Sequence, residues 1–273
     1  RNSIDGGGYE TYLEGHIPGS IHSDYMKAGW RVARNGIPGL IPSEKEFQKL
    51  ARSIGVNQNS HVILVPAGVS STDFGSSARA YWTFKSFGHE KVSILNGGWT
   101  NWKKTYPSQI ETGAPIAPLT GNFVASLATN DYIDTNGVEQ IVKDKSSQVI
   151  LLDGRPEKQF WGEEKHPKVL AAGHIPGAKL LTQSEAYDEI NNSLKQIEAL
   201  DEIYGDISKK PVVSYCNTGH WAAMNWFVLS ELLGNKNVLL YDGSMVEWTR
   251  DSTRPLVKEK SNFMKIKEFF RLG

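Results

Sequence analysis

Two short motifs each occur twice in this 273-residue chain, and the repeat limits the folds that are available to it. The sequence GHIPGS at 15–20 recurs as GHIPGA at 173–178. Asn-Gly-Gly at 96–98, with a tryptophan four residues later, recurs as Asp-Gly-Ser at 242–244 with the same spacing to a tryptophan. One copy of each motif per half, in the same order, predicts two domains of similar fold. The length suits two domains of about 130 residues each.

Apolar runs of strand length alternate with helical patterns in both halves. The runs that we expect to form strands are 62–65, 92–95, 149–152 and 211–215. Ser43 and Glu46 form a capping box at the start of a helix that runs towards Ser53. A second helical pattern, at 222–233, ends at Gly234. The alternation predicts an α/β fold in which each domain has a mostly parallel sheet with helices on both faces.

The segment between the halves is rich in proline, threonine and glycine, which is typical of a linker. We therefore expect an N-terminal domain at 1–110, a linker at 111–122 and a C-terminal domain at 123–273. Beyond Pro255, spaced apolar side chains predict a docked amphipathic tail. These side chains are Phe263, Met264, Ile266, Phe269 and Phe270.

Charge and cysteine content exclude several classes of protein. Thirty basic and thirty acidic side chains balance, so we expect no nucleic-acid or membrane partner. No apolar run reaches the length of a bilayer span. A single cysteine rules out an internal disulfide and a cysteine-based metal cluster, so we expect no metal site. These features suit a soluble protein and leave its compartment, cytoplasmic or periplasmic, open.

The only cysteine, Cys216, lies where an expected strand ends and a short loop begins. The following helix starts near Ala222, so loop N–H groups and the helix N-terminus favour a thiolate at this position. The alternative is a cysteine that only fills space in the core. A packing cysteine would sit inside the strand or helix, whereas this one opens a loop that contains Gly219. We therefore expect a reactive thiol.

The loop resembles the active-site loop of the rhodanese sulfurtransferases, which begins with the catalytic cysteine and leads into a helix. Its residues here are Cys216, Asn217, Thr218, Gly219, His220 and Trp221. Asp153-Gly154-Arg155, GHIPGA at 173–178 and Asp-Gly-Ser at 242–244 with Glu247-Trp248 are similar to three further motifs of that family, in the same order. The resemblance implies two rhodanese-like domains and a Cys216 persulfide that carries sulfur from donor to acceptor.

The resemblance also implies the reaction partners. The donor would be a small anion such as thiosulfate or 3-mercaptopyruvate. With no second cysteine, the acceptor would be an external thiol, cyanide or a thioredoxin-like protein, and no cofactor is implied. Asn217 and Thr218 are neutral, and the resemblance implies that neutral residues at these loop positions favour 3-mercaptopyruvate over thiosulfate as the donor. His220 either donates a hydrogen bond to the donor or fills space, and Trp221 forms a pocket wall.

Arg155 and Gln159 are the candidate donor-binding residues outside the loop. Arg155 has a structural alternative, because it can pair with Asp153 at the end of the strand. Thiosulfate and mercaptopyruvate sulfurtransferases carry an arginine four residues after Arg155, where this chain has Gln159. We therefore expect weak binding of thiosulfate, unless a lysine compensates. The lysines nearest in sequence are Lys158, Lys165 and Lys168.

The first half lacks the nucleophile. Pro66 occupies the place of Cys216, so the first domain is expected to be catalytically silent. We expect a longer loop, 66–75, before a helix at 76–87 that Gly88 ends. Its hydroxyls, on Ser70, Ser71 and Thr72, have no apparent base. Arg1 would match Arg155, in which case either the strand that should precede it is missing from this sequence or the first domain is atypical.

Two other functions remain as alternatives. A non-catalytic sulfur carrier or binding module of the same fold would keep the thiol loop but turn over small donors poorly. Phosphatases and arsenate reductases of related fold need an arginine six residues after the cysteine, to clamp a tetrahedral oxyanion. That position is Ala222, which counts against both of these classes.

Overall fold

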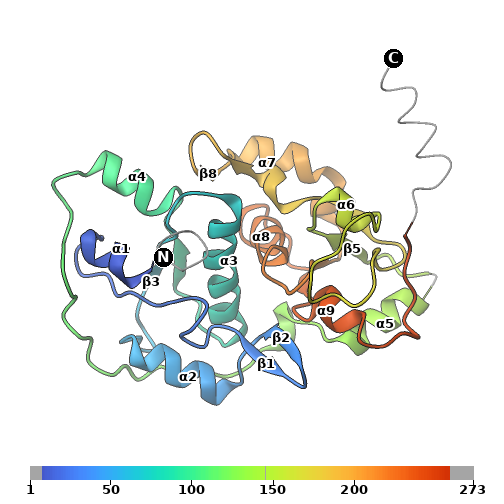
Figure 1. Ribbon diagram of the computed structural model, residues 1–273, viewed down its shortest axis with the longest axis horizontal. Coiled ribbons are helices and arrows are strands. Elements are labelled where there is room, and N and C mark those ends of the chain that lie inside the picture. Colours follow the sequence, from blue (N-terminus) through green and yellow to red (C-terminus); the bar gives the residue numbers. More distant parts are fainter. Residues whose placement is uncertain (1–7, 145, 259–273) are drawn as a thin grey trace.

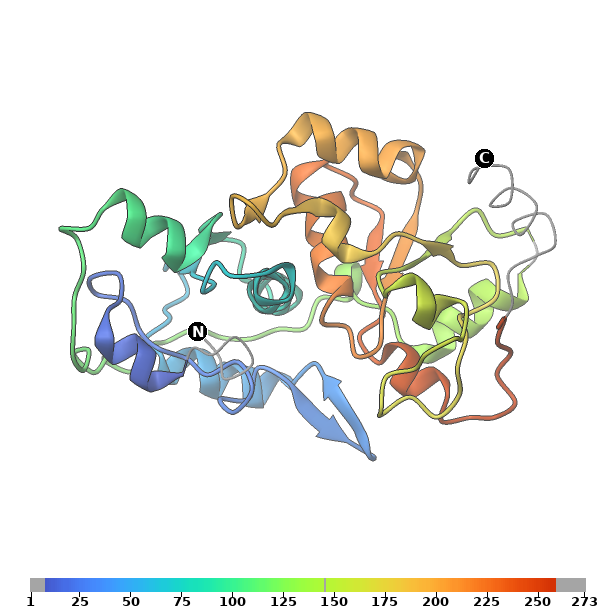
Figure 2. The same ribbon diagram turned by 45° about the horizontal axis from the view of Figure 1, so that its top comes forward.

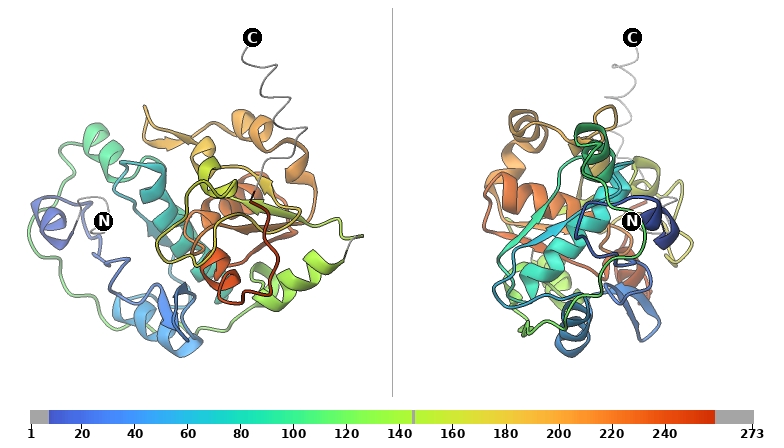
Figure 3. Two further views of the ribbon diagram at one scale, coloured as in Figure 1. Left: turned by 45° about the vertical axis from the view of Figure 1, so that its right-hand side comes forward. Right: turned by 90° about the vertical axis from the view of Figure 1, so that its left-hand side faces the viewer.

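The computed structural model describes residues 8–144 and 146–258 of the chain. Its two halves lie side by side, with the long helix α3 running between them (Figures 1 and 3). The first half contains α1 (Tyr9–Glu14), β1 (Val32–Arg34), β2 (Ile37–Leu40), α2 (Glu44–Ser53), β3 (Val62–Leu64), α3 (Ser71–Ser86), β4 (Val92–Ile94) and α4 (Gly98–Thr105). The predicted capping box is present, because Ser43 and Glu46 hydrogen-bond reciprocally at the start of α2.

The second half is built on a four-stranded parallel sheet in the order β10-β9-β5-β6. Its strands are β5 (Ile150–Asp153), β6 (Lys179–Leu180), β9 (Val212–Tyr215) and β10 (Val238–Leu240), beside the small antiparallel pair β7 (Tyr187–Asp188) and β8 (Ser193–Leu194). Its α-helices are α5 (Thr135–Lys143), α6 (Glu157–Phe160), α7 (Ile197–Tyr204), α8 (Ala222–Phe227) and α9 (Ser244–Trp248). Shorter helical turns are η2 (Thr129–Asp131), η3 (Gln183–Ala186), η4 (Gly205–Lys209) and the π-helical η5 (Val228–Leu232).

Alternate residues of the sheet point to opposite faces, and both faces are covered. Leu152 and Val212 join a core that includes α7 and α8. Leu151 and Val213 join a second core with α5 and α9. All four side chains are buried, as expected for a parallel sheet between helices. The predicted fold class is therefore confirmed. No helix among the described residues has the length and apolar character needed to cross a bilayer.

The first-half sheet differs from the second in its burial. β3 pairs in parallel with β4, in the arrangement that β9 has with β10. Ile63 in β3 is 58% exposed, whereas Val213 at the matching place in β9 is 1% exposed. Val213 is buried because it packs against side chains of α5 and α9, whereas Ile63 belongs to neither apolar core cluster of the described residues. The expected match of Arg1 with Arg155, and the expected tail helix, lie outside the described residues.

Helix α3 begins earlier than predicted, at Ser71 rather than Ser76. The Ser70 hydroxyl accepts the N–H of Asp73 at 3.1 Å and caps the helix. The loop from Pro66 to the start of α3, 66–70, is therefore one residue shorter than the loop from Cys216 to the start of α8, 216–221, and the expectation of a longer first-half loop was wrong. The predicted helix at 222–233 also changes its character, because a π-helical turn follows α8 before the chain turns at Gly234 (φ +72°).

One apolar core extends through both halves. Helix α3 is buried on almost every side, and its Phe74 and Tyr81 pack against Phe227 of α8. Figure 2 shows α3 end-on beside the second half. Phe123 is fully buried against Phe47 in the first half, and the N–H of Ala128 donates to Ser86 there. On this packing we propose that the second domain starts after residue 128 rather than at 123.

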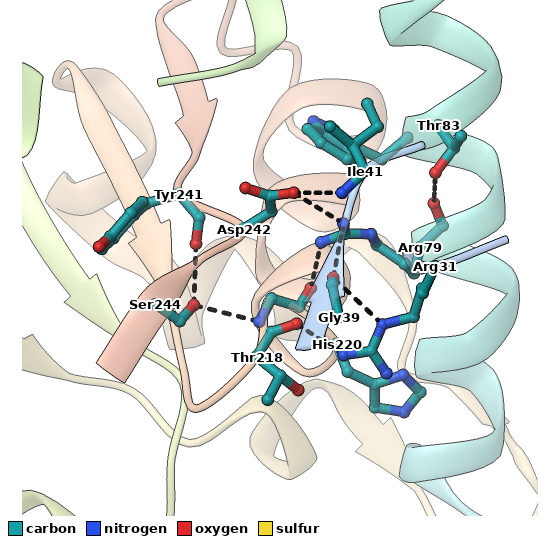
Figure 4. A network of polar contacts seen from close by, with 12 residues as sticks. Arg31, Gly39, Ile41, Arg79, Thr83, Thr218, His220, Tyr241, Asp242 and Ser244 are labelled. Carbon is teal, nitrogen blue, oxygen red and sulfur yellow. Dashed lines mark hydrogen bonds and ion pairs between the residues drawn. The ribbon is translucent and has the colours of Figure 1, made fainter. Parts of the chain in front are cut away.

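A buried ion pair crosses between the halves. Arg79 in α3 lies 3.1 Å from the carboxylate of Asp242, and the two side chains are 0% and 1% exposed. The Arg79 guanidinium also donates to the carbonyl oxygens of Gly39 and Gly219, at 3.2 and 3.3 Å. Burial lowers the pKa of Arg79, and the Asp242 carboxylate opposes that shift. Asp242 in turn accepts the N–H of Ile41 at 2.6 Å, so the pair ties four segments together (Figure 4).

Breaking this pair on one side should be costly. Asp242→Asn leaves the buried Arg79 charge uncompensated, so we expect the free energy of unfolding to fall by about 3–5 kcal/mol. Urea titration measures this quantity. The double variant Asp242→Asn/Arg79→Met removes both charges. Its loss of unfolding free energy should be smaller than the sum of the losses in the two single variants. Strictly additive losses would show that the two charges do not interact.

Candidate active site

Cys216 lies at the carboxyl end of β9, between the ends of the neighbouring strands β5 and β10. This is where parallel α/β sheets place their ligand sites. The thiol is 1% exposed and lies in the wall of a pocket of about 390 Å³. The structure therefore places the predicted cysteine in a concave site of the size expected for a small-molecule pocket.

Both halves of the chain line this pocket. The first half contributes Tyr25, Met26, Arg31, Val32, Ala33, Pro38, Gly39 and Thr72, and the second half contributes His166, Lys168, Cys216, Asn217, Thr218, His220 and Trp221. Predicted loop residues are thus brought together around the thiol. No aspartate or glutamate is among the lining residues, so the charges that face the pocket are positive.

Ser244 holds the cysteine loop in shape. Its hydroxyl accepts the N–H groups of Cys216 at 3.0 Å and Gly219 at 3.1 Å, and it donates to the carbonyl of Tyr241. Ser244 has φ +50°, an uncommon conformation for a residue other than glycine. Sequence analysis identified 242–244 only as a repeated motif and did not predict this function as a loop anchor.

Other N–H groups of the loop remain available to a ligand. Within the described part of the chain, the N–H groups of Asn217, Thr218 and His220 have no protein acceptor. Buried N–H groups without a partner are costly, and an anion near the thiol would satisfy them. The loop can therefore stabilise negative charge on or beside the Cys216 sulfur.

His220 is held by the first half of the chain. Its Nε2 lies 2.9 Å from the carbonyl oxygen of Thr72, and its Nδ1 lies 2.9 Å from the hydroxyl of Tyr25. A carbonyl only accepts, so Nε2 carries the hydrogen and Nδ1 accepts from Tyr25. Burial, aided by the charge of Arg31, lowers the pKa of His220 to about 3. A neutral His220 with both ring nitrogens occupied joins the domains and is not a proton carrier.

The predicted residues outside the loop have different positions. Arg155 makes a bidentate pair with Asp153 and donates to Gly173 at 2.8 Å, so its guanidinium stabilises the strand end and does not line the pocket. Gln159 lies against the loop, because its side-chain oxygen accepts from the amide of Asn217 at 2.8 Å. It is not among the pocket-lining residues either.

Of the three lysines considered from the sequence, only Lys168 lines the pocket. Lys158 pairs with Glu164, and Lys165 donates to a backbone carbonyl. Arg31 also lines the pocket, and sequence analysis missed it. It stands in a stretch with no strand or helix pattern and no neighbouring motif, so the linear sequence carries no signal for its role.

The equivalent loop of the first half is already filled. The Asp73 carboxylate accepts the N–H groups of Ala67 at 3.1 Å and Gly68 at 2.6 Å, so the first-half loop binds an anion of its own chain. The nearby hydroxyls are also occupied. Ser71 accepts from Gln183 at 3.2 Å, and Thr72 accepts from the indole of Trp221 at 3.1 Å.

The low pKa of His220 has a measurable effect on stability. An unfolded chain protonates this histidine below about pH 6.5, whereas the folded chain resists protonation down to about pH 3. The unfolded state then binds more protons, so the free energy of unfolding falls as the pH is lowered through this window, by up to about 1.4 kcal/mol per pH unit. We expect His220→Gln to have a shallower pH dependence than the parent in urea titrations. Identical slopes would mean that His220 is charged in the folded protein.

Both halves of the chain are similar to a known domain family. The profile of the Rhodanese-like domain matches residues 3–105 and 135–251. The chain is 33% identical to 3-mercaptopyruvate sulfurtransferase of Escherichia coli over 251 residues, covering 90% of this chain and 85% of that protein. It is 32% identical to the sulfur carrier protein TtuD of Thermus thermophilus, covering 90% and 87%. It is 31% identical to thiosulfate sulfurtransferase of Gallus gallus, covering 88% and 80%.

A solved structure has the same fold. The Tum1 protein of Saccharomyces cerevisiae aligns with a TM-score of 0.74 at 23% identity, over 91% of this chain and 85% of that one. Two profile matches, relatives above 30% identity over most of their length, and a thiol loop at the end of a central parallel strand agree with one another. This chain belongs to the rhodanese-like family and is a tandem-domain sulfurtransferase.

Proposed function

We propose that the protein moves a sulfane sulfur from a small anionic donor to an external acceptor through a persulfide on Cys216. The observation that carries this proposal is the position of the thiol. It is the only cysteine of the chain, and it lies in a pocket lined by cations, on a loop with N–H groups free to bind an anion.

The first half-reaction uses thiosulfate or 3-mercaptopyruvate, as the names of the relatives suggest. The Cys216 thiolate attacks the outer sulfur and a new S–S bond forms. From thiosulfate, the sulfur–sulfur bond breaks and sulfite leaves with its electron pair. From 3-mercaptopyruvate, the carbon–sulfur bond breaks, and the carbon takes up the thiol proton to give pyruvate. The persulfide anion then rests against the loop N–H groups.

The second half-reaction regenerates the enzyme. A thiol, cyanide or a thioredoxin-like protein attacks the outer sulfur, and the Cys216 thiolate leaves. Because the chain has no other cysteine, no internal thiol competes for the sulfur. The two half-reactions form a ping-pong cycle.

One further candidate is favoured by a specific observation, since one relative is named a sulfur carrier protein. A carrier would form the same persulfide and release it only to a partner protein. Phosphatase and arsenate reductase chemistry has no support here. Ala222, which stands where those enzymes need an arginine, is fully buried at the start of α8.

The persulfide can be detected directly. Incubation with thiosulfate or 3-mercaptopyruvate, without acceptor, should increase the intact mass by one sulfur atom, and cyanide should remove it. Cys216→Ser should not gain this mass. Sulfur uptake by the serine variant would refute the role of Cys216. Uptake by the parent followed by rapid return with cyanide supports the enzyme, whereas retention of sulfur in the presence of cyanide and small thiols supports the carrier.

A further inference from the structure

Arg31 reaches the cysteine loop from the opposite half of the chain. It directly precedes β1, and its Nη2 donates to the carbonyl oxygen of Thr218 at 2.8 Å. Its Nε donates to the carbonyl oxygen of Gly39 in β2 at 3.3 Å. Figure 4 shows the guanidinium beside these groups and near the ring of His220. Arg31 therefore touches the loop two residues after the nucleophile and lines the same pocket.

The backbone around Arg31 leaves room for its side chain. Gly39 has φ +90°, and a Cβ at this position would lie 2.3 Å from the Arg31 Nη2. Only glycine fits this combination of conformation and close approach. The Gly39 carbonyl also accepts from the buried Arg79, which is itself paired with Asp242. The Arg31 guanidinium is thus held by a rigid network and is not a freely moving surface group.

Much of the guanidinium remains unpaired. It carries five N–H groups. Two of them donate to Gly39 and Thr218, and the Tyr25 side chain also contacts the group. Within the described residues no carboxylate lies within ion-pair distance of Arg31, whereas Arg79 and Arg155 each have one. The rest of the group borders Tyr25 and the pocket. A partly buried cation without a counterion favours binding of an anion.

The surroundings of the pocket strengthen this preference. Lys168 and His166 line it from the second half, and the pKa of His166 is lowered by burial and by the charges of Lys168 and Arg31. Met26, Val32 and Pro38 add apolar side chains to the pocket lining. Charge interactions are stronger beside protein atoms of low polarity than at a fully solvated surface.

We propose that Arg31 is the specificity-determining residue of this site and binds the oxyanion or carboxylate of the sulfur donor through its free edge. This inference rests on the proposed function for its biological meaning. Gln159 stands where related sulfurtransferases carry an arginine, and its side-chain oxygen accepts a hydrogen bond from Asn217. Arg31 would supply the positive charge that is missing at that position. The planar fork that binds an oxyanion in two parallel bonds comes from the first domain in this chain. The domain without a nucleophile thereby recognises the donor.

A test that does not depend on sulfur transfer is available, because Cys216 is the only cysteine. Iodoacetate and iodoacetamide alkylate a thiolate in the same way, with loss of iodide, and differ mainly in charge. The ratio of their rates on Cys216, followed by intact mass, measures the preference of the pocket for a carboxylate. We expect this ratio in the parent to exceed the ratio for a free small thiol.

Arg31→Gln should lower the ratio by about tenfold, because a charged hydrogen bond is replaced by a neutral one. Arg31→Lys should retain part of the preference, since it keeps the charge and loses the fork. Arg34→Gln is the matched control. It removes one positive charge from the same hairpin, but Arg34 pairs with Glu46 and does not line the pocket. Its ratio should stay within about twofold of the parent.

Steady-state kinetics then connect the alkylation result to the reaction. Arg31→Gln should raise KM for thiosulfate and 3-mercaptopyruvate by about tenfold, and Arg34→Gln should not. If Arg31→Gln slows both alkylating reagents equally, Arg31 only shapes the loop through Thr218 and the proposal is overturned. A parent ratio no higher than that of a small thiol overturns it without any variant. A fall in the ratio without any persulfide in the parent would support the anion site and refute the proposed sulfur transfer.

Discussion

The buried charge of Arg79 is the contact on which the site depends. It lies in α3, and it meets the Asp242 carboxylate and the carbonyl oxygens of Gly39 and Gly219. Burying a guanidinium is costly unless oxygen atoms meet it, so the contacts of Arg79 with these groups favour their coming together as the chain folds. In doing so they bring the hairpin β1–β2, the cysteine loop and the turn before α9 to one place.

From that arrangement the geometry of the active site follows. The turn that carries Asp242 also carries Ser244, which accepts two N–H groups of the cysteine loop. The hairpin that carries Gly39 places Arg31 against Thr218. Loop shape and pocket charge therefore come from residues far apart in sequence, and the sheet itself supplies only the position of Cys216.

Comparison of the two halves shows how one local structure serves two purposes. Each half has a short loop between a strand and a helix, at 66–70 and 216–221. In the first half, the Asp73 carboxylate occupies the loop N–H groups, and Pro66 replaces the nucleophile. In the second half, Cys216 begins the loop and several N–H groups stay free for a ligand. The first half supports the second-half loop, because Thr72 accepts hydrogen bonds from the side chains of His220 and Trp221.

Much of the fold was predictable because it rests on local patterns. Strand runs, the Ser43 capping box and the glycine that ends the helical segment after α8 are all encoded within a few residues. The start of α3 was predicted too late. The stretch before Ser76 is rich in serine and glycine, which is typical of a loop, although Ser70 caps the helix there through the N–H of Asp73. The π-helical turn after α8 was missed as well, since an apolar segment of this kind looks like an uninterrupted helix.

The sequence by itself determined the family, the repeat and the identity of the nucleophile, because a lone cysteine between a strand and a helix is a local feature. Only the tertiary structure decided which charges face that cysteine. Arg155, a candidate from the sequence, donates to Asp153 and Gly173 and does not line the pocket. Arg31 of the first half does line it. Long-range packing determines these positions. A buried guanidinium needs hydrogen-bond acceptors, and the acceptors of Arg31 are close to one another only when the two halves are packed together.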